Sequence, residues 1–398
     1  MAKLIDITGK ALAGEWGTDD ETGCGIPVLR TTNFTNEGIV NYNDVVTRTI
    51  TKKNINDKFL RKGDIIIEKS GGSDKFPVGR VVYFDGEENT YLFNNFTGLL
   101  RVKNQDVWYP RYVFYSLLAN YKRGGTRAFE NKTTGLHNLK TDDYVSRYEI
   151  VEADIEEQIS ICEKLDKLYG IIKSRKKELQ LLDDLIKARF VELFGDESNP
   201  YGWNIVNVED VASVQVGVVI KPAQYYTDAE NGIRAFRSLN IGPMYIKDTD
   251  WVYFSEEGND KNAKSILSEN DLIIVRSGAP GTACVVTKEY AGCNAIDIII
   301  AHPDMKKVNP YYLCAYTNLP HGKRQIDEGT GGAAQQHFNV GKYNKLQLML
   351  PPMEKQNEFV SFMEQVDKSK FVVLLIPGNN IWAKIIVIGY LVSTMIII

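Results

Sequence analysis

Residues 26–33 read IPVLRTTN, and residues 233–240, 207 positions further on, read IRAFRSLN. At the same offset, DIIIEKSG at residues 64–71 meets DLIIVRSG at residues 271–278. Two matches with one offset are improbable by chance, so they predict a repeated structural unit. A third match has slightly different spacing, GLHNL at 135–139 against QQHFNV at 335–340. Its two copies lead into Glu156-Glu157-Gln158 and Glu354-Lys355-Gln356. Each half is therefore expected to be one module followed by a helix.

The composition is that of a globular chain with room for two domains. Its 398 residues are 43% hydrophobic and 25% charged, with a formal net charge of -4. This total lacks the basic footprint of most nucleic-acid-binding proteins, although a local basic surface can lie within it. Five cysteines without a C-x-x-C pair and four scattered histidines predict neither a disulfide framework nor a metal site. A reducing cytoplasm fits this pattern, and the N-terminus resembles no secretory signal.

A long helix is predicted after the first module. Residues 1 to about 150 carry short β-rich runs separated by Gly and Asn turns, whereas Gly and Pro nearly vanish from residues 154–194. Apolar residues there recur at heptad a and d positions, which favours a coiled coil over an ordinary amphipathic core helix. The expected helix-pairing seam consists of Leu165, Leu168, Ile172, Leu179, Leu182, Ile186 and Leu193.

The second half follows the same plan but ends differently. A linker at residues 195–202 ends the helix, a second module runs to about Leu350, and Pro351-Pro352 begins a shorter helix. The tail, residues 376–398, is apolar with Lys384 as its only charge. It is interpreted as the product of a shifted reading frame, a packed element or a membrane anchor. The predicted parts are a first module at residues 1–150, a long helix at 151–195, a second module at 196–352, a short helix at 353–375 and the apolar tail at 376–398.

This order of modules and helices, with LFGD at 193–196 and NPYGW at 199–203, resembles the specificity (S) subunit of type I restriction-modification systems. The resemblance is supported by KGDII at 62–66, GGAAQQHFN at 331–339 and PPMEKQ at 351–356, and it covers residues 1 to about 372. It implies an α+β fold with two β-rich mixed target-recognition domains in tandem. Each would be followed by a long helix, the second one shortened, and the helices would pair as an antiparallel coiled coil.

The resemblance also implies a function. Each module would read one half of a bipartite site in double-stranded DNA, and the paired helices would set the spacing between the halves. Two methyltransferase (M) subunits and restriction (R) subunits would be the partners, and they would use S-adenosylmethionine, ATP and Mg. This chain itself would bind no cofactor or metal and would carry no catalytic residue. Because the second helix is short, we expect poor assembly with the methyltransferase subunits or self-association.

Candidate DNA contacts come from two segments predicted to be equivalent basic, Gly-rich loops, residues 121–133 and 321–336. Each lies just before a histidine anchor, His137 or His337. Lysine and arginine neutralise phosphates, glycine allows close backbone approach, and glutamine can pair with adenine. Arg30 and Arg237 occur in both halves, which favours a structural or phosphate-binding role. A positive charge is also kept at Lys69 and Arg276. The candidates are Arg30, Lys69, Lys122, Arg123, Arg127, Lys132, Arg237, Arg276, Lys323, Arg324, Gln335 and Gln336.

Two other functions compete with DNA reading. An enzyme is disfavoured, because the chain has no Asn/Asp-Pro-Pro-aromatic motif, no G-x-G-x-x-G after a strand and no P-loop. Asp64, Glu68 and Lys69 faintly resemble a nuclease site, but Val275 replaces Glu68 in the other half. A tandem scaffold that binds proteins without DNA readout, or an inactive truncated specificity subunit, is the remaining alternative.

Overall fold

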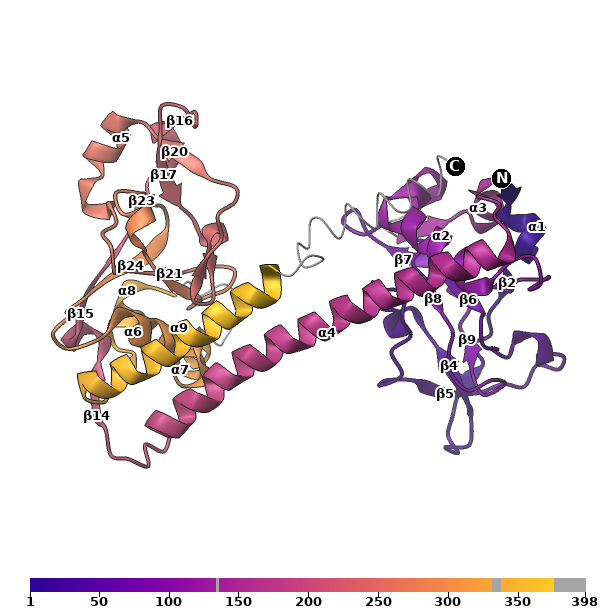
Figure 1. Ribbon diagram of the computed structural model, residues 1–398, viewed down its shortest axis with the longest axis horizontal. Helices are drawn as coiled ribbons and strands as arrows, with labels where there is room; N and C mark the ends of the chain where they lie inside the picture. Colours follow the sequence, from indigo (N-terminus) through magenta and orange to yellow (C-terminus); the bar gives the residue numbers. More distant parts are fainter. Residues whose placement is uncertain (134–135, 331–337, 376–398) are drawn as a thin grey trace. The chain divides into compact units, whose positions relative to one another are not determined.

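The computed structural model describes residues 1–133, 136–330 and 338–375 (Figure 1). The chain forms two compact units that divide within one long helix, between Lys176 and Lys177. Both units mix short strands with helices, which confirms the α+β class. The tail at 376–398 lies outside the described residues. Within the described ranges, no helix is long and apolar enough to cross a membrane.

The first module, residues 1–150, is built on two four-stranded sheets. One has the order β2-β10-β6-β8, the other β3-β5-β4-β9, and a three-stranded sheet has the order β11-β12-β7. The strands are β1 (Ala2–Lys3), β2 (Leu12–Ala13), β3 (Thr18–Asp19), β4 (Ile26–Leu29), β5 (Val46–Thr49), β6 (Ile65–Glu68), β7 (Ser70–Gly72), β8 (Val81–Tyr83), β9 (Leu92–Phe93), β10 (Thr97–Leu100), β11 (Glu130–Thr133), β12 (Leu136–Leu139) and β13 (Glu149–Ile150). The helices are α1 (Leu4–Thr8), α2 (Pro110–Lys122) and α3 (Thr141–Arg147).

The second module, residues 203–350, repeats the two four-stranded sheets. Its four-stranded sheets have the orders β15-β24-β21-β22 and β16-β20-β17-β23, and β14 pairs with β25 as β1 pairs with β13. The strands are β14 (Asn204–Asn207), β15 (Ala212–Val216), β16 (Tyr226–Thr227), β17 (Ile233–Phe236), β18 (Ile241–Gly242), β19 (Tyr245–Ile246), β20 (Val252–Phe254), β21 (Leu272–Val275), β22 (Ala283–Val285), β23 (Asn294–Ala295), β24 (Ile298–Pro303) and β25 (Gln347–Leu350). The helices are α5 (Glu256–Lys261), α6 (Pro310–Asn318), α7 (Pro320–Thr330) and α8 (Val340–Asn344).

The repeated apolar runs form the central strands β6 and β21. Successive side chains of a strand point to opposite faces, so a run of β-branched residues can fill two cores at once. Ile65 and Ile67 enter one core of the first module, whereas Ile66 enters the other with Phe84 and Phe93. In the second module, Leu272 and Ile274 likewise enter one core, whereas Ile273 and Val275 enter the other. This explains why both runs are continuous rather than alternating.

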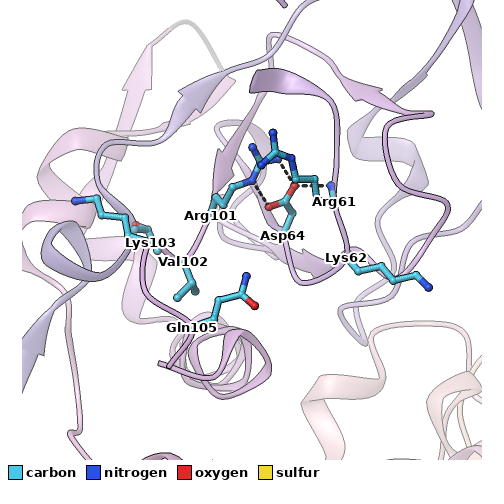
Figure 2. Close-up of a pocket in the computed structure, with 8 residues that line it drawn as sticks. Arg61, Lys62, Asp64, Arg101, Val102, Lys103 and Gln105 are labelled. Atoms are coloured by element: carbon cyan, nitrogen blue, oxygen red, sulfur yellow. Dashed lines mark hydrogen bonds and ion pairs between the residues drawn. The ribbon is translucent and has the colours of Figure 1, made fainter. Parts of the chain in front are cut away.

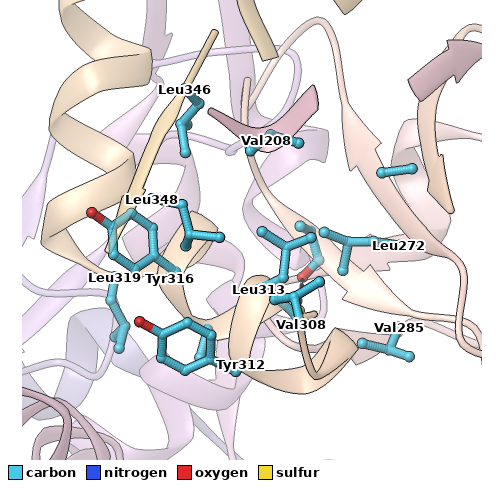
Figure 3. Close-up of a cluster of buried hydrophobic side chains, with 14 of the residues drawn as sticks. Val208, Leu272, Val285, Val308, Tyr312, Leu313, Tyr316, Leu319, Leu346 and Leu348 are labelled. Carbon is cyan, nitrogen blue, oxygen red and sulfur yellow. Dashed lines mark hydrogen bonds between the residues drawn. The ribbon is translucent and has the colours of Figure 1, made fainter. Parts of the chain in front are cut away.

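The larger core of the second module joins the sheet to the helices α6 and α9 (Met353–Leu375). Figure 3 shows Leu272 and Val285 from the sheet near Leu313 of α6 and Val308, which precedes it. Further members are Tyr312, Tyr316, Leu319, Leu346 and Leu348. The phenol of Tyr312 donates a 2.7 Å hydrogen bond to the carbonyl of Met349, so its polar end is satisfied although the ring is buried.

Two long helices follow the modules: α4 runs from Ile155 to Phe194 and α9 from Met353 to Leu375 (Figure 1). Within the second unit, α9 packs antiparallel to the C-terminal part of α4. Phe359 of α9 contacts Phe190 and Phe194 at ring-centroid distances of 5.2 and 5.6 Å. Further along α9, Lys370 forms a 2.8 Å ion pair with Asp183, which lies earlier in α4. The two contacts define the opposite directions of the helices.

The predicted seam of α4 is divided between two partners. Leu182, Ile186 and Leu193 pack in the core that contains the α9 side chains. Leu165, in contrast, is 3% exposed and belongs to the core of the first module. Leu168, Ile172 and Leu179 are half-buried. Leu165 is thus covered by the first module instead of by α9, because a heptad pattern specifies an apolar face but not what covers it.

Candidate nucleic-acid interface

Arg30 and Arg237 occupy equivalent positions and make equivalent contacts. The backbone N–H of each donates to an asparagine Oδ1 three residues later, Asn33 or Asn240, at 2.9 Å. The Arg30 guanidinium donates to the carbonyl of Asp44 at 3.3 Å and to its carboxylate at 3.0 Å, and that of Arg237 donates to the carbonyl of Asp250. Both arginines therefore hold loops of the shared scaffold.

A buried aspartate precedes the central strand of each module. Asp64 accepts from the backbone N–H of Arg61 at 2.7 Å and from Nε and Nη2 of Arg101 at 2.7 and 2.6 Å (Figure 2). Asp271 accepts from the backbone N–H of Ser268 at 2.7 Å and lies 2.6 Å from Nδ1 of His302. This hydrogen bond to Asp271 raises the pKa of His302. The carboxylates thus cap the turns before β6 and β21.

The faint nuclease pattern in the first module consists of structural ion pairs. Glu68 pairs with Arg80 at 3.2 Å while Asp64 pairs with Arg101, so arginine guanidinium groups occupy both carboxylates. Burial raises the pKa of Glu68, against the effect of Arg80. Among the described residues, no three His, Cys, Asp or Glu side chains are grouped as a metal site would require. Both carboxylates are thus ion-pair partners within the scaffold of the first module.

The basic segment 121–133 is not one loop. Lys122 is the last residue of α2. Its pKa is lowered, mainly by burial and also by the charge of Lys176, against the opposite effect of Glu37. Arg123 follows directly, and a 3-10 helix, Gly125–Phe129, contains Arg127. Lys132 lies in β11, opposite His137 of β12. Three of the four cations therefore lie on three different elements, and Arg123 lies between two of them.

Lys69 and Arg276 directly follow the central strands of their modules. Burial lowers the pKa of Lys69, whose backbone N–H donates to the carbonyl of Phe96 at 2.8 Å. Arg276 forms an ion pair with Asp297 and donates from Nε to the carbonyl of Phe338 at 3.4 Å. The positive charge kept in both halves thus lies at the end of a buried strand.

The segment 321–325 was expected to be a glycine-rich loop, and the structure corrects this. These residues lie in α7, which begins at Pro320. Gly322 serves close packing rather than loop flexibility, because a Cβ there would lie 2.4 Å from the carbonyl oxygen of Tyr316. Lys323 donates to the carbonyl of Pro280 at 2.6 Å, and Arg324 pairs with Glu197. Gln335, Gln336 and His337 lie outside the described residues.

The comparison with known proteins decides the family. A model of the type I restriction modification DNA specificity domain matches residues 3–182 and 200–372, one copy for each half. The chain belongs to this family. It carries two DNA specificity domains, so its function class is DNA sequence specificity in a restriction-modification system.

Individual relatives agree with this assignment. The chain is 20% identical to the type I restriction enzyme EcoBI specificity subunit of Escherichia coli over 325 residues, 73% of this chain and 67% of the relative. It is 23% identical to the StySPI specificity subunit of Salmonella potsdam over 364 residues, 86% and 75% of the two chains. The crystal structure of a type I S subunit from M. genitalium has a similar fold, with a TM-score of 0.55, 14% identity and coverage of 99% and 93%.

In this specificity chain, sequence reasoning missed the role of one repeated residue. Gln158 of α4 is fully buried; its Oε1 accepts from the N–H of Tyr109 at 2.9 Å, and its Nε2 donates to the carbonyls of Val107 and Ala153 at 2.9 and 2.8 Å. In the second half, Gln356 of α9 is also fully buried, and its contacts repeat this pattern. They are with the N–H of Asn309 at 2.8 Å and the carbonyls of Lys307 and Pro351 at 3.3 and 2.9 Å. Each glutamine attaches a helix to its own module. The repeat of Glu156-Glu157-Gln158 as Glu354-Lys355-Gln356 was the available signal.

Proposed function

We propose that this chain is the sequence-reading subunit of a type I restriction-modification complex and that each module reads one half of a bipartite DNA site. One observation supports this most strongly: the two modules share their scaffold down to single hydrogen bonds, as at Gln158 and Gln356, but differ in exposed segments. Reading an asymmetric split site needs two different surfaces on equivalent supports. Phosphate contacts would position each module, and base contacts would discriminate the sequence.

Catalysis would reside in partners of this chain. Two methyltransferase subunits would use S-adenosylmethionine, restriction subunits would use ATP and Mg, and this chain would bind none of these. The helices α4 and α9 would hold the modules at a defined separation, which fits a site with a gap between its halves. Such a complex would act in the cytoplasm, where it meets DNA.

Mapping of N6-methyladenine across the genome tests the proposal. Cells would express the chain with its cognate methyltransferase, and matched cells would lack the chain. A split motif with an unspecified gap that appears only when the chain is present is the expected result. An unchanged methylation pattern, with the complex assembled and the methyltransferase active on a second specificity chain, would refute DNA reading and favour a protein-binding scaffold.

A further inference from the structure

An exposed turn follows β7 in the first module, at residues 73–77 (SDKFP). The backbone of Ser73 donates to the carbonyl of Phe76 at 2.7 Å, and the Ser73 hydroxyl accepts from the N–H of Phe76 at 3.1 Å. The chain therefore reverses tightly, and the tip carries Lys75 and Phe76. Phe76 is 51% exposed, and the Lys75 ammonium lies 5.4 Å from the centre of its ring. An apolar ring beside a cation is thus presented to the outside.

The turn is fixed on both sides by side chains that leave its tip uncovered. Arg127 donates from Nη2 to the carbonyls of Asp74 and Lys75, at 3.0 and 3.5 Å. Directly after the turn, the N–H of Val78 donates to Glu130 at 3.0 Å. The same Glu130 lies 3.1 Å from Nδ1 of His137, whose Nε2 is 3.6 Å from the Asp74 carboxylate. A loop held this firmly is preorganised, so little ordering entropy would be lost when its tip meets a partner.

The second module has the same anchoring principle but a different tip. In the first module, Ile67 of β6 pairs with Val81 of β8, which lies 14 residues later in the chain. In the second module, the equivalent Ile274 of β21 pairs with Ala283 of β22, which lies 9 residues later. The first loop is therefore five residues longer. The second loop carries Ala279 and Pro280 at the corresponding place, and Lys323 holds the carbonyl of Pro280 as Arg127 holds those of the first loop. Two different half-sites require two loops that are anchored alike but present different residues, as these two loops do.

We propose that the 73–77 turn is a DNA-reading element of the first module. Phe76 contacts the apolar edges of bases in a groove, and Lys75 contacts an adjacent phosphate. Apolar side chains read thymine methyl groups or enter between base steps, and lysine supplies the phosphate charge nearby. The Ala279-Pro280 tip takes the corresponding place at the second half-site. This inference rests on the proposed function, because it assumes that each module meets one half of a split site.

The test uses the two half-sites as controls for each other. After the wild-type motif has been read by N6-methyladenine mapping, the same mapping is made in cells expressing Phe76→Ala. We expect relaxation of one or two positions in one half-site, with the other half unchanged, and in binding at least about tenfold lower discrimination at those positions. Ile39→Ala is the matched control: Ile39 is 48% exposed and follows Gly38, which packs against α2, and its loss should leave the motif intact.

Every other outcome is informative. If the wild-type chain directs no split motif, the proposed function itself fails. If it does, and Phe76→Ala leaves all positions unchanged, the turn does not read DNA. Loss of methylation at all sites would overturn the inference too, because it would indicate that Phe76 docks a protein subunit or supports the fold. Lys75→Ala should lower the slope of log affinity against log salt by about 1 without changing the motif.

Discussion

His302 lies 2.6 Å from the buried carboxylate of Asp271, at the position where Arg101 meets Asp64 in the first module. The equivalence follows from strand register, since Leu100 faces Ile65 and Ala301 faces Leu272. The two modules thus share the aspartate but differ in its partner, which is an arginine in the first module and a histidine in the second. An arginine remains charged at every accessible pH, whereas a histidine does not.

This exchange predicts a pH-dependent stability. The hydrogen bond to Asp271 raises the pKa of His302 above the usual histidine value of 6.5. Its contribution to stability is therefore complete below about pH 6.5 and is lost as the pH rises through the folded-state pKa. Urea unfolding between pH 6 and pH 8.5 should show this decline, and His302→Arg should abolish that part of it. The Gln215 amide, which lies 2.9 Å from Nε2 of His302, favours the neutral imidazole as a hydrogen-bond donor. An equal pH dependence in the wild type and in His302→Arg would show that this contact outweighs the ion pair with Asp271.

Gln356 should be a major determinant of stability in the second module. Gln356→Ala leaves one N–H and two carbonyl groups without their partner in a buried site, and each unsatisfied group costs about 1–3 kcal/mol. We expect a loss of about 3 kcal/mol or more in urea unfolding. Gln180→Ala is the control, because this exposed glutamine donates to Asp184 of its own helix. Similar losses for the two variants would contradict the attachment role.

Phe359 should stabilise the pairing of α9 with α4 more than the ion pairs do. The ring is fully buried against Phe190 and Phe194, so Phe359→Ala removes buried area and leaves a cavity at a cost of about 3–5 kcal/mol. Lys370→Ala breaks a partly exposed ion pair with Asp183, which is worth about 1 kcal/mol or less. Calorimetric unfolding of both variants compares the two effects, and a larger loss for Lys370→Ala would reverse this ranking.

Arg127 should act as a positioning residue rather than as a phosphate contact, because its guanidinium already binds the 73–77 turn. Arg127→Ala should lower discrimination at the first half-site by about tenfold while the salt dependence of binding stays constant. A decrease of about 1 in the salt slope would instead identify a phosphate contact. Arg147→Ala, at an exposed arginine of α3 outside the candidate contacts, controls for a general loss of positive charge.

The repeat, the two modules and the long helix could be predicted from the sequence. Matches at one offset, such as residues 64–71 with 271–278, report a shared scaffold because the same buried strand needs the same apolar residues. The heptad pattern in residues 154–194 likewise predicts a helix, because its period is a local property of the chain. Arg30 and Arg237 are also retained in both halves, and both contact loops of the shared scaffold.

Only the tertiary structure decided which partner each side chain contacts. Lys323 and Arg324 lie in a helix because Pro320 begins it and Gly322 lets it pack against α6, whereas the sequence shows only a basic stretch with glycines. Leu165 packs on the first module and not on α9. The most distant partners of Arg127 and Gln356 are 53 and 49 residues away in the chain. The sequence by itself therefore determined the scaffold, since period and repetition are local signals, and folding determined the contacts, since they join residues that no local pattern relates.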